Sequence, residues 1–286
     1  MNSKIKLWTQ LGLGTALAGG VLAACGGEAG GEGAGTEAVA PGESGAAAGE
    51  GEGGAGGEGA GGEAAGGEGE GGVAVSDAAT DPVAYGIALA VTEAHVVAAR
   101  DAFAAGKQDA AAEMFAHPAA EVLVEMDPVF TQLGVKDFKP LLTDASVAVA
   151  DGKSAAEVNR HYDAIIAALR GAATKAPDSD ASDAKVAAAV IADQIERASA
   201  MYRTIAKDDR YEPYLDGYGF AKVAASAFES SGAAIKAENP ALHARIAEAL
   251  GVLKQAYPGA NRPAKLAVEQ GALSAASSKV MLAAAG

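Results

Sequence analysis

The residues best suited to chemistry are two of the four histidines, His95 and His117, and the carboxylates that follow His117. Glu121 lies four residues after His117 and Glu125 lies four residues further on, so a regular helix would place all three on one face. Imidazole nitrogens and carboxylate oxygens that converge at about 2 Å from an ion are ligands for iron, zinc or copper. The sequence therefore predicts a metal site formed by His95, His117 and Glu121.

A helical hairpin would bring His95 to that site. Gly106 is a natural turn residue, and His95 and His117 each lie eleven residues from it, so helices folded back at Gly106 would place the two rings side by side. A second interpretation stays open. Pro118 removes a backbone donor and breaks or kinks helices. His117 could then cap a helix end, with His95 a satisfied core residue and Glu121 part of a solvated face.

The region that must position these residues has the pattern of helices. From about residue 80 to 286, Leu, Ile, Val and Phe recur at helical spacing, glycines and prolines separate the runs, and no stretch alternates with period two. We expect an all-α bundle of about eight helices in two four-helix halves, divided at the Asp/Ser-rich turn near residues 177–183. The expected helices are 82–105, 109–134 (interrupted at Pro118), 136–150, 154–174, one after the turn that carries Val186 to Met201, 219–236, 240–257 and one that opens at Pro263.

Cys25 is the only cysteine in the chain, and it closes a leader with the three parts of an export signal. Lys4 and Lys6 are followed by a short apolar run and then by small residues. The tetrad 22–25, Leu-Ala-Ala-Cys, resembles the lipobox of bacterial lipoproteins. That resemblance implies a signal peptide over residues 1–24, lipidation of Cys25 and anchoring in a membrane, since more than one acyl chain gives a stable anchor. Gly26 in place of an aspartate implies the outer membrane, facing the periplasm.

Residues 26–72 consist almost entirely of Gly, Ala and Glu, with ten Glu and no Lys or Arg. No side chain there is large enough to pack, so we expect residues 25–79 to form a disordered tether. As a flexible coil, the 47 residues of 26–72 would reach roughly 35–40 Å. The chain charge of −15 becomes −17 without Lys4 and Lys6, and −7 without the ten Glu. The domain at 80–286 is thus acidic, without a basic patch, and nucleic acid is not an expected partner.

The sequence contains no signature of an enzyme. A Gly-x-Ser-x-Gly elbow, a Walker loop, a dinucleotide fingerprint and a His-Glu-x-x-His motif are all missing from it. Tyr211, Tyr214 and Tyr218 fall close together in a stretch that we interpret as a loop. Phenolates can ligate ferric iron, but tyrosines that flank a Pro/Gly turn are more typical of packing. We therefore expect no catalytic activity.

The exported helical domain resembles the imelysin-like proteins, which include the iron-uptake lipoprotein of ferrous-iron transport systems. The likeness covers about residues 80–286. It rests on the His–carboxylate element and on the segments Tyr214-Leu-Asp-Gly-Tyr-Gly-Phe220 and Asn239-Pro-Ala-Leu242. The family motif is His-x-x-Glu, whereas here His117 and Glu121 are separated by three residues that include Pro118, so only these two positions could carry over. The resemblance implies capture or delivery of a metal, iron above all, without catalysis. The alternative is a scaffold or partner-binding envelope lipoprotein without metal.

Overall fold

Helix α1 (Pro82–Ala104) forms where the sequence predicts it, and it is the most deeply buried helix of the fold. The computed structural model describes residues 75–285. Asp81 caps the helix by accepting a hydrogen bond from the Val83 N–H at 2.8 Å, and Pro82 occupies the first helical position, where its missing N–H costs nothing. Neighbouring helices cover α1 on several sides, so it carries a mostly apolar sequence and one buried carboxylate, Glu93. That carboxylate receives two hydrogen bonds from Arg170.

The described residues are all-helical and contain no strand, which confirms the predicted fold class. A 3-10 turn (Val75–Asp77) precedes the α-helices. The helices after α1 are α2 (Gln108–Ala120), α3 (Val122–Leu133), α4 (Lys139–Ala150), α5 (Ala155–Ala173), α6 (Asp183–Ile205), α7 (Glu212–Glu238), α8 (Pro240–Ala256) and α9 (Gln270–Ala285).

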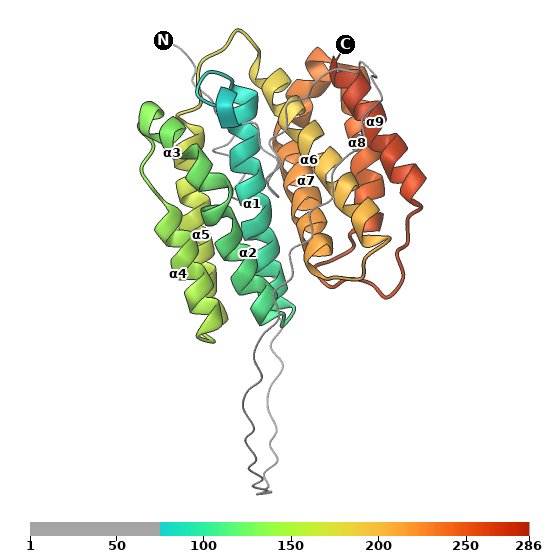
Figure 1. Ribbon diagram of the computed structural model, residues 1–286. Helices are drawn as coiled ribbons and strands as arrows, with labels where there is room; N and C mark the ends of the chain where they lie inside the picture. The colour runs from blue at the N-terminus through green and yellow to red at the C-terminus, as the bar shows by residue number, and fades with distance from the viewer. Residues whose placement is uncertain (1–74, 286) are drawn as a thin grey trace, which may run out of the picture. The chain divides into compact units, whose positions relative to one another are not determined.

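Two groups of helices emerge from the packing, α1 to α5 and α6 to α9. In the first, α1 contacts α2 and α5, and α4 contacts the same two helices. In the second, α6 contacts α7 and α9, and α8 contacts the same two helices. The chain passes from the first group to the second through the turn between α5 and α6. Figure 1 shows α1, in teal, between the two groups, and α1 packs on both α6 and α7 of the second group.

The expected second helix is divided, which raises the number of described α-helices from the expected eight to nine. The division does not fall at Pro118, which lies inside the last turns of α2. It falls at Glu121, whose φ of −105° departs from the helical average, although its ψ of −61° lies in the right-handed region and its N–H still donates to the His117 carbonyl. Because Pro118 has no N–H to donate, the ladder is already weakened one turn before the break. Glu121 and Glu125 therefore do not continue the helix that carries His117.

Helix α7 begins at Glu212, seven residues before the predicted start at Gly219. The segment that we interpreted as a loop because of Pro213, Gly217 and Gly219 is the first part of a long helix. Pro213 is tolerated because it lies in the first turn. A Cβ on Gly217 would lie 2.1 Å from the Tyr257 hydroxyl oxygen, and one on Gly219 would lie 2.4 Å from the Ala94 carbonyl oxygen. These glycines allow close packing and do not end the helix.

Helix α9, by contrast, begins later than expected, at Gln270 and not at Pro263. The intervening residues form a loop that is held against the end of α6. The Arg262 guanidinium donates to the carbonyl of Ile205, the last residue of α6, and to the carbonyls of Asp208 and Asp209, which follow the helix. The predicted signal peptide, the predicted lipidation site Cys25 and the predicted tether up to residue 74 lie outside the described residues.

Candidate metal site

The two histidines of the predicted site lie side by side across the α1–α2 hairpin. Gly106 closes the turn with a φ of 75°, a conformation that glycine adopts without strain. The rings of His95 and His117 are 6.3 Å apart between centroids, at an interplanar angle of 64°. The juxtaposition expected from their equal spacing about Gly106 is therefore present. The assignment of His95, His117 and Glu121 as ligands of one metal stays a prediction.

His95 is buried, and its environment selects one tautomer. Its Nδ1 lies 2.8 Å from the Val91 carbonyl oxygen. A carbonyl can only accept, so Nδ1 carries the proton and Nε2 carries the lone pair of the neutral ring. Burial lowers the pKa of His95, although the hydrogen bond to Val91 and the charge of Glu121 act in the opposite direction. The favoured form is thus a neutral imidazole with Nε2 available to an electrophile or a metal.

His117 belongs to a cluster of three residues that we call the surface triad: Glu113, His117 and Glu212. His117 Nε2 lies 3.6 Å from Glu113 Oε1, which is one helical turn earlier on α2, and 3.8 Å from Glu212 Oε1 on α7. One candidate ligand atom from each residue lies within 4.8 Å of the other two. The side chains are 22% (His117), 59% (Glu113) and 42% (Glu212) exposed, so solvent reaches the cluster.

The spacing in the surface triad suits a first-row transition metal. Metal–nitrogen and metal–oxygen bonds in such sites are about 2.0–2.2 Å long, so two ligand atoms of one ion are at most roughly 4.2 Å apart. The separations of 3.6 and 3.8 Å lie within this range. The remaining pair, Glu113 and Glu212, needs only small rotations of exposed side chains. One imidazole and two carboxylates are a ligand set for iron, zinc, copper or manganese, with positions left for water.

A second histidine–carboxylate pair lies next to the triad and deeper in the fold. His95 Nε2 is 3.6 Å from Asp216 Oδ1, and the two side chains are 8% and 19% exposed. Asp216 lies four residues after Glu212, so both carboxylates project from the same face of α7. The Phe220 ring packs edge-on against His95 at 5.9 Å and forms an apolar wall. Arg197 of α6 also lies close enough to lower the pKa of His95.

The structure brings together a ligand set that differs in part from the predicted one. His95 and His117 are adjacent, and Glu121 acts electrostatically on His95 from the break between α2 and α3. Among the described residues, however, the three-residue group around His117 contains Glu113 and Glu212 and does not contain Glu121. Glu113 could have been recognised from its position four residues before His117. Glu212 and Asp216 could not, because their segment was interpreted as a loop.

The tyrosines near the predicted loop are structural and belong to helix α7 or its start. The hydroxyls of Tyr211 and Tyr214 donate to the carbonyls of Ala260 and Gly259, and the Tyr218 hydroxyl donates to Asp101. Burial raises the pKa of Tyr214 to about 12, so the phenolate form needed for a metal ligand is disfavoured. These residues pack the fold and hold the loop after α8, in line with the packing interpretation.

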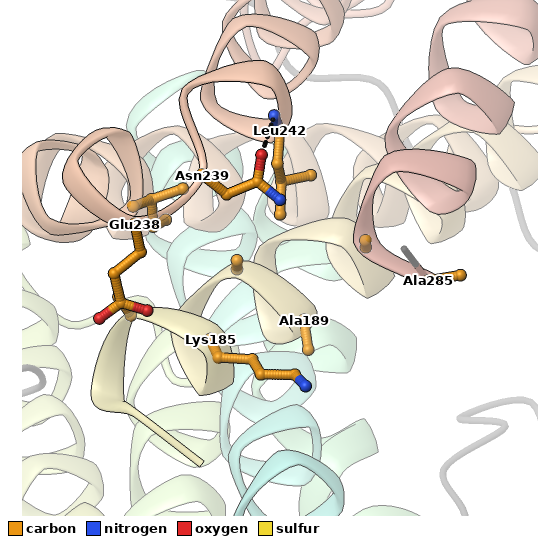
Figure 2. Close-up of a pocket in the computed structure, with 10 residues that line it drawn as sticks. Lys185, Ala189, Glu238, Asn239, Leu242 and Ala285 are labelled. Carbon is orange, nitrogen blue, oxygen red and sulfur yellow. Dashed lines mark hydrogen bonds between the residues drawn. The ribbon is translucent and has the colours of Figure 1, made fainter.

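A groove on the second group of helices is separate from this cluster. Figure 2 shows Lys185 and Ala189 of α6, Glu238 and Asn239 at the α7–α8 junction, and Ala285 of α9 around it. Its volume of about 290 Å³ is at the lower end of the range for small-molecule sites. The side-chain amide oxygen Oδ1 of Asn239 accepts from the Leu242 N–H and caps α8, so this side chain is already engaged.

Helix α1 is, among the described residues, the one helix long and apolar enough to cross a membrane by length and composition, but 89% of its most apolar stretch is buried inside the fold. That burial is ordinary for a core helix. Comparisons of the chain with protein-family models, with curated proteins and with solved structures found no match.

Proposed function

We propose that this chain is a non-enzymatic, lipid-anchored envelope protein that binds a divalent transition metal, iron first, for uptake or delivery. The observation that supports the proposal best is the surface triad, in which two helices distant in sequence supply an imidazole and two carboxylates to one point. The lipobox-like tetrad ending at Cys25 supports the location, on the outer membrane facing the periplasm. Iron is preferred because the resemblance to imelysin-like proteins implies it.

The exposure of the triad favours reversible binding. Structural zinc sites are closed, with four protein ligands, and hold their ion permanently. The triad offers three protein ligands, two of them on half-exposed glutamates, and leaves room for water or for a ligand from a partner. A site of this kind can exchange its ion, which is what capture and delivery require.

Titration of the purified protein with Fe²⁺ under anaerobic conditions, and with Zn²⁺ and Cu²⁺, tests the function. We expect binding tighter than about 100 µM. The double variant Glu113→Gln/His117→Ala should weaken it at least tenfold. His161→Ala removes a histidine from α5, outside the site, and serves as the matched control with unchanged affinity. Wild-type binding weaker than 100 µM, or equal binding by the double variant and the control, would refute the proposal. Elemental analysis of protein purified from its native envelope would identify the metal.

A second candidate function is that of a partner-binding envelope lipoprotein without metal. The observation that favours it is the pair of exposed apolar side chains on α9, Met281 and Leu282, on the helix that also lines the groove. Leu282 is 76% exposed, so its apolar side chain is accessible to a partner. Pull-downs from envelope fractions should then recover a partner with the wild type and lose it with Leu282→Lys. If the wild type and Leu282→Lys recover the same amount of partner, the exposed side chains of α9 are not the binding surface.

A further inference from the structure

The surface triad joins two helices that belong to different groups of the fold. Glu113 and His117 lie on α2, whereas Glu212 is the first residue of α7. Helix α2 packs on α1, α3 and α4, and α7 packs on α1, α6 and α8, so α1 is their common neighbour. Figure 1 shows this position of α1 between the two groups. An ion held by the triad would therefore bond one group directly to the other.

The start of α7 is held more firmly by its own group than by α2. The hydroxyls of Tyr211 and Tyr214 donate to backbone carbonyls of the loop after α8, at 2.8 and 2.7 Å. Toward α2, the Glu212 carboxylate lies 3.8 Å from His117 Nε2. Lys107 Nζ, at the start of α2, lies 6.0 Å from the centre of the Tyr211 ring, and exposed cation–π contacts are weak. The contacts toward the second group are thus hydrogen bonds, whereas these contacts toward α2 are longer.

Charge decides whether the two glutamates of the triad separate α2 from α7 or hold them together. Candidate ligand oxygens of Glu113 and Glu212 lie within 4.8 Å of each other. Two carboxylates at this distance repel each other, although water screens part of the repulsion. A divalent ion bonded to both carboxylates and to His117 reverses the sign, because each carboxylate then faces a positive charge at about 2 Å. Metal binding should therefore draw the start of α7 toward α2.

We propose that a metal ion in the surface triad clamps the start of α7 to α2, so that the empty and the loaded protein differ in the local stability of this region. This inference rests on the proposed metal-binding function and adds a regulatory consequence to it. Residues 206–211, between α6 and α7, are mostly exposed and lead directly into Glu212. An ion that holds Glu212 therefore also holds the end of this loop. The loop gives a delivery partner a surface on which loaded and empty protein differ.

Hydrogen exchange of the full-length protein, measured by mass spectrometry with and without Zn²⁺, tests the clamp. An opening that lifts Glu212 off the ion leaves two protein ligands, so the metal suppresses this opening by the ratio of its affinities for the closed and open forms. Loss of an outer-shell partner alone costs about 10–100-fold in metal affinity. Saturating Zn²⁺ should therefore slow amide exchange in residues 206–216 at least about tenfold. A similar ratio should separate the Zn²⁺ affinities of the wild type and Glu212→Gln.

Two variants of α7 distinguish a clamp from general stabilisation by bound metal. Glu212→Gln should bind Zn²⁺ more weakly and lose the metal-dependent protection at the start of α7. Glu229→Gln removes an exposed carboxylate of the same helix outside the triad, and this control should keep both properties. If wild-type protein binds Zn²⁺ without slower exchange in residues 206–216, or if Glu212→Gln is protected equally, the clamp is overturned and the proposed function stays intact. Absence of Zn²⁺ binding by the wild type would refute both.

Discussion

Gly219 offers a way to separate the two helices that carry the candidate site. It lies on α7 one turn after Asp216, and it faces α1 at Ala94, the neighbour of His95. In Gly219→Ala, the new Cβ would lie 2.4 Å from the Ala94 carbonyl oxygen, whereas ordinary contact begins at 3.4 Å. The backbone oxygen cannot rotate away, so α1 and α7 must separate locally by about 1 Å.

The expected change in the free energy of unfolding is the sum of two opposing contributions, helix propensity and overpacking. Alanine is favoured over glycine in a helix by about 1 kcal/mol. Overpacking a tight contact costs about 1–3 kcal/mol. Gly251 on α8 reports helix propensity alone, because it is exposed and a Cβ there would meet nothing within 4 Å. Gly251→Ala should therefore raise the free energy of unfolding by up to about 1 kcal/mol. The free energy of unfolding of Gly219→Ala should be about 1–3 kcal/mol lower than that of Gly251→Ala.

Urea unfolding followed by circular dichroism measures both variants on the same scale, and metal titration measures the consequence for the site. Because Glu212 lies on α7, displacement of this helix from α1 should weaken metal binding in Gly219→Ala, and binding should be unchanged in Gly251→Ala. Equal stability of the two variants would refute the close-packing explanation of Gly219. Lower stability with full metal affinity would show that the site does not depend on the α1–α7 contact.

Two further predictions concern the anchor and alkaline stability. Cys25→Ser should abolish labelling by radioactive palmitate and move the protein from the membrane to the soluble fraction; labelling that persists would exclude Cys25 as the acceptor. Burial raises the pKa of Tyr214 to about 12 and raises that of Tyr257 as well, so the folded state resists ionisation of these phenols. Their contribution is complete below the unfolded value of 10.0 and is lost as the pH rises toward the folded value. The melting temperature should therefore decrease from about pH 10 upward, and it should decrease less steeply in Tyr257→Phe. A melting temperature that is constant to pH 11 would contradict this prediction.

Much of the helical fold follows from local signals. Asp81 with Pro82, Ser154 and Asn239 each begin a helix within a residue of where the structure begins it, because an N-cap acts on amides two or three residues away. The hairpin that pairs His95 with His117 is equally local, since one glycine turn joins two helices of known rise. The division into two groups follows from the Asp/Ser-rich turn between α5 and α6, although the first group holds five helices and not the expected four.

The wrong predictions share a cause. Pro213, Gly217 and Gly219 are helix breakers by propensity, yet they lie inside α7. Propensity amounts to about 1 kcal/mol per glycine, and burial of a long helix against α1 and α6 exceeds it. Pro118 is a breaker too, yet the discontinuity falls three residues later, at Glu121. Neither outcome can be derived from the residues nearby.

The sequence alone determined the all-helical class, the hairpin and the neighbouring pair of histidines, because each depends on interactions over a few residues or on one turn. It also carries the lipobox-like tetrad at Cys25, which is a linear motif. Only the tertiary structure decided which carboxylates meet the histidines. Glu212 and Asp216 are separated from them by about a hundred residues of chain, and they arrive because α7 packs closely on α1 where glycine leaves room. Such a meeting depends on the packing of whole helices, and no local pattern encodes it.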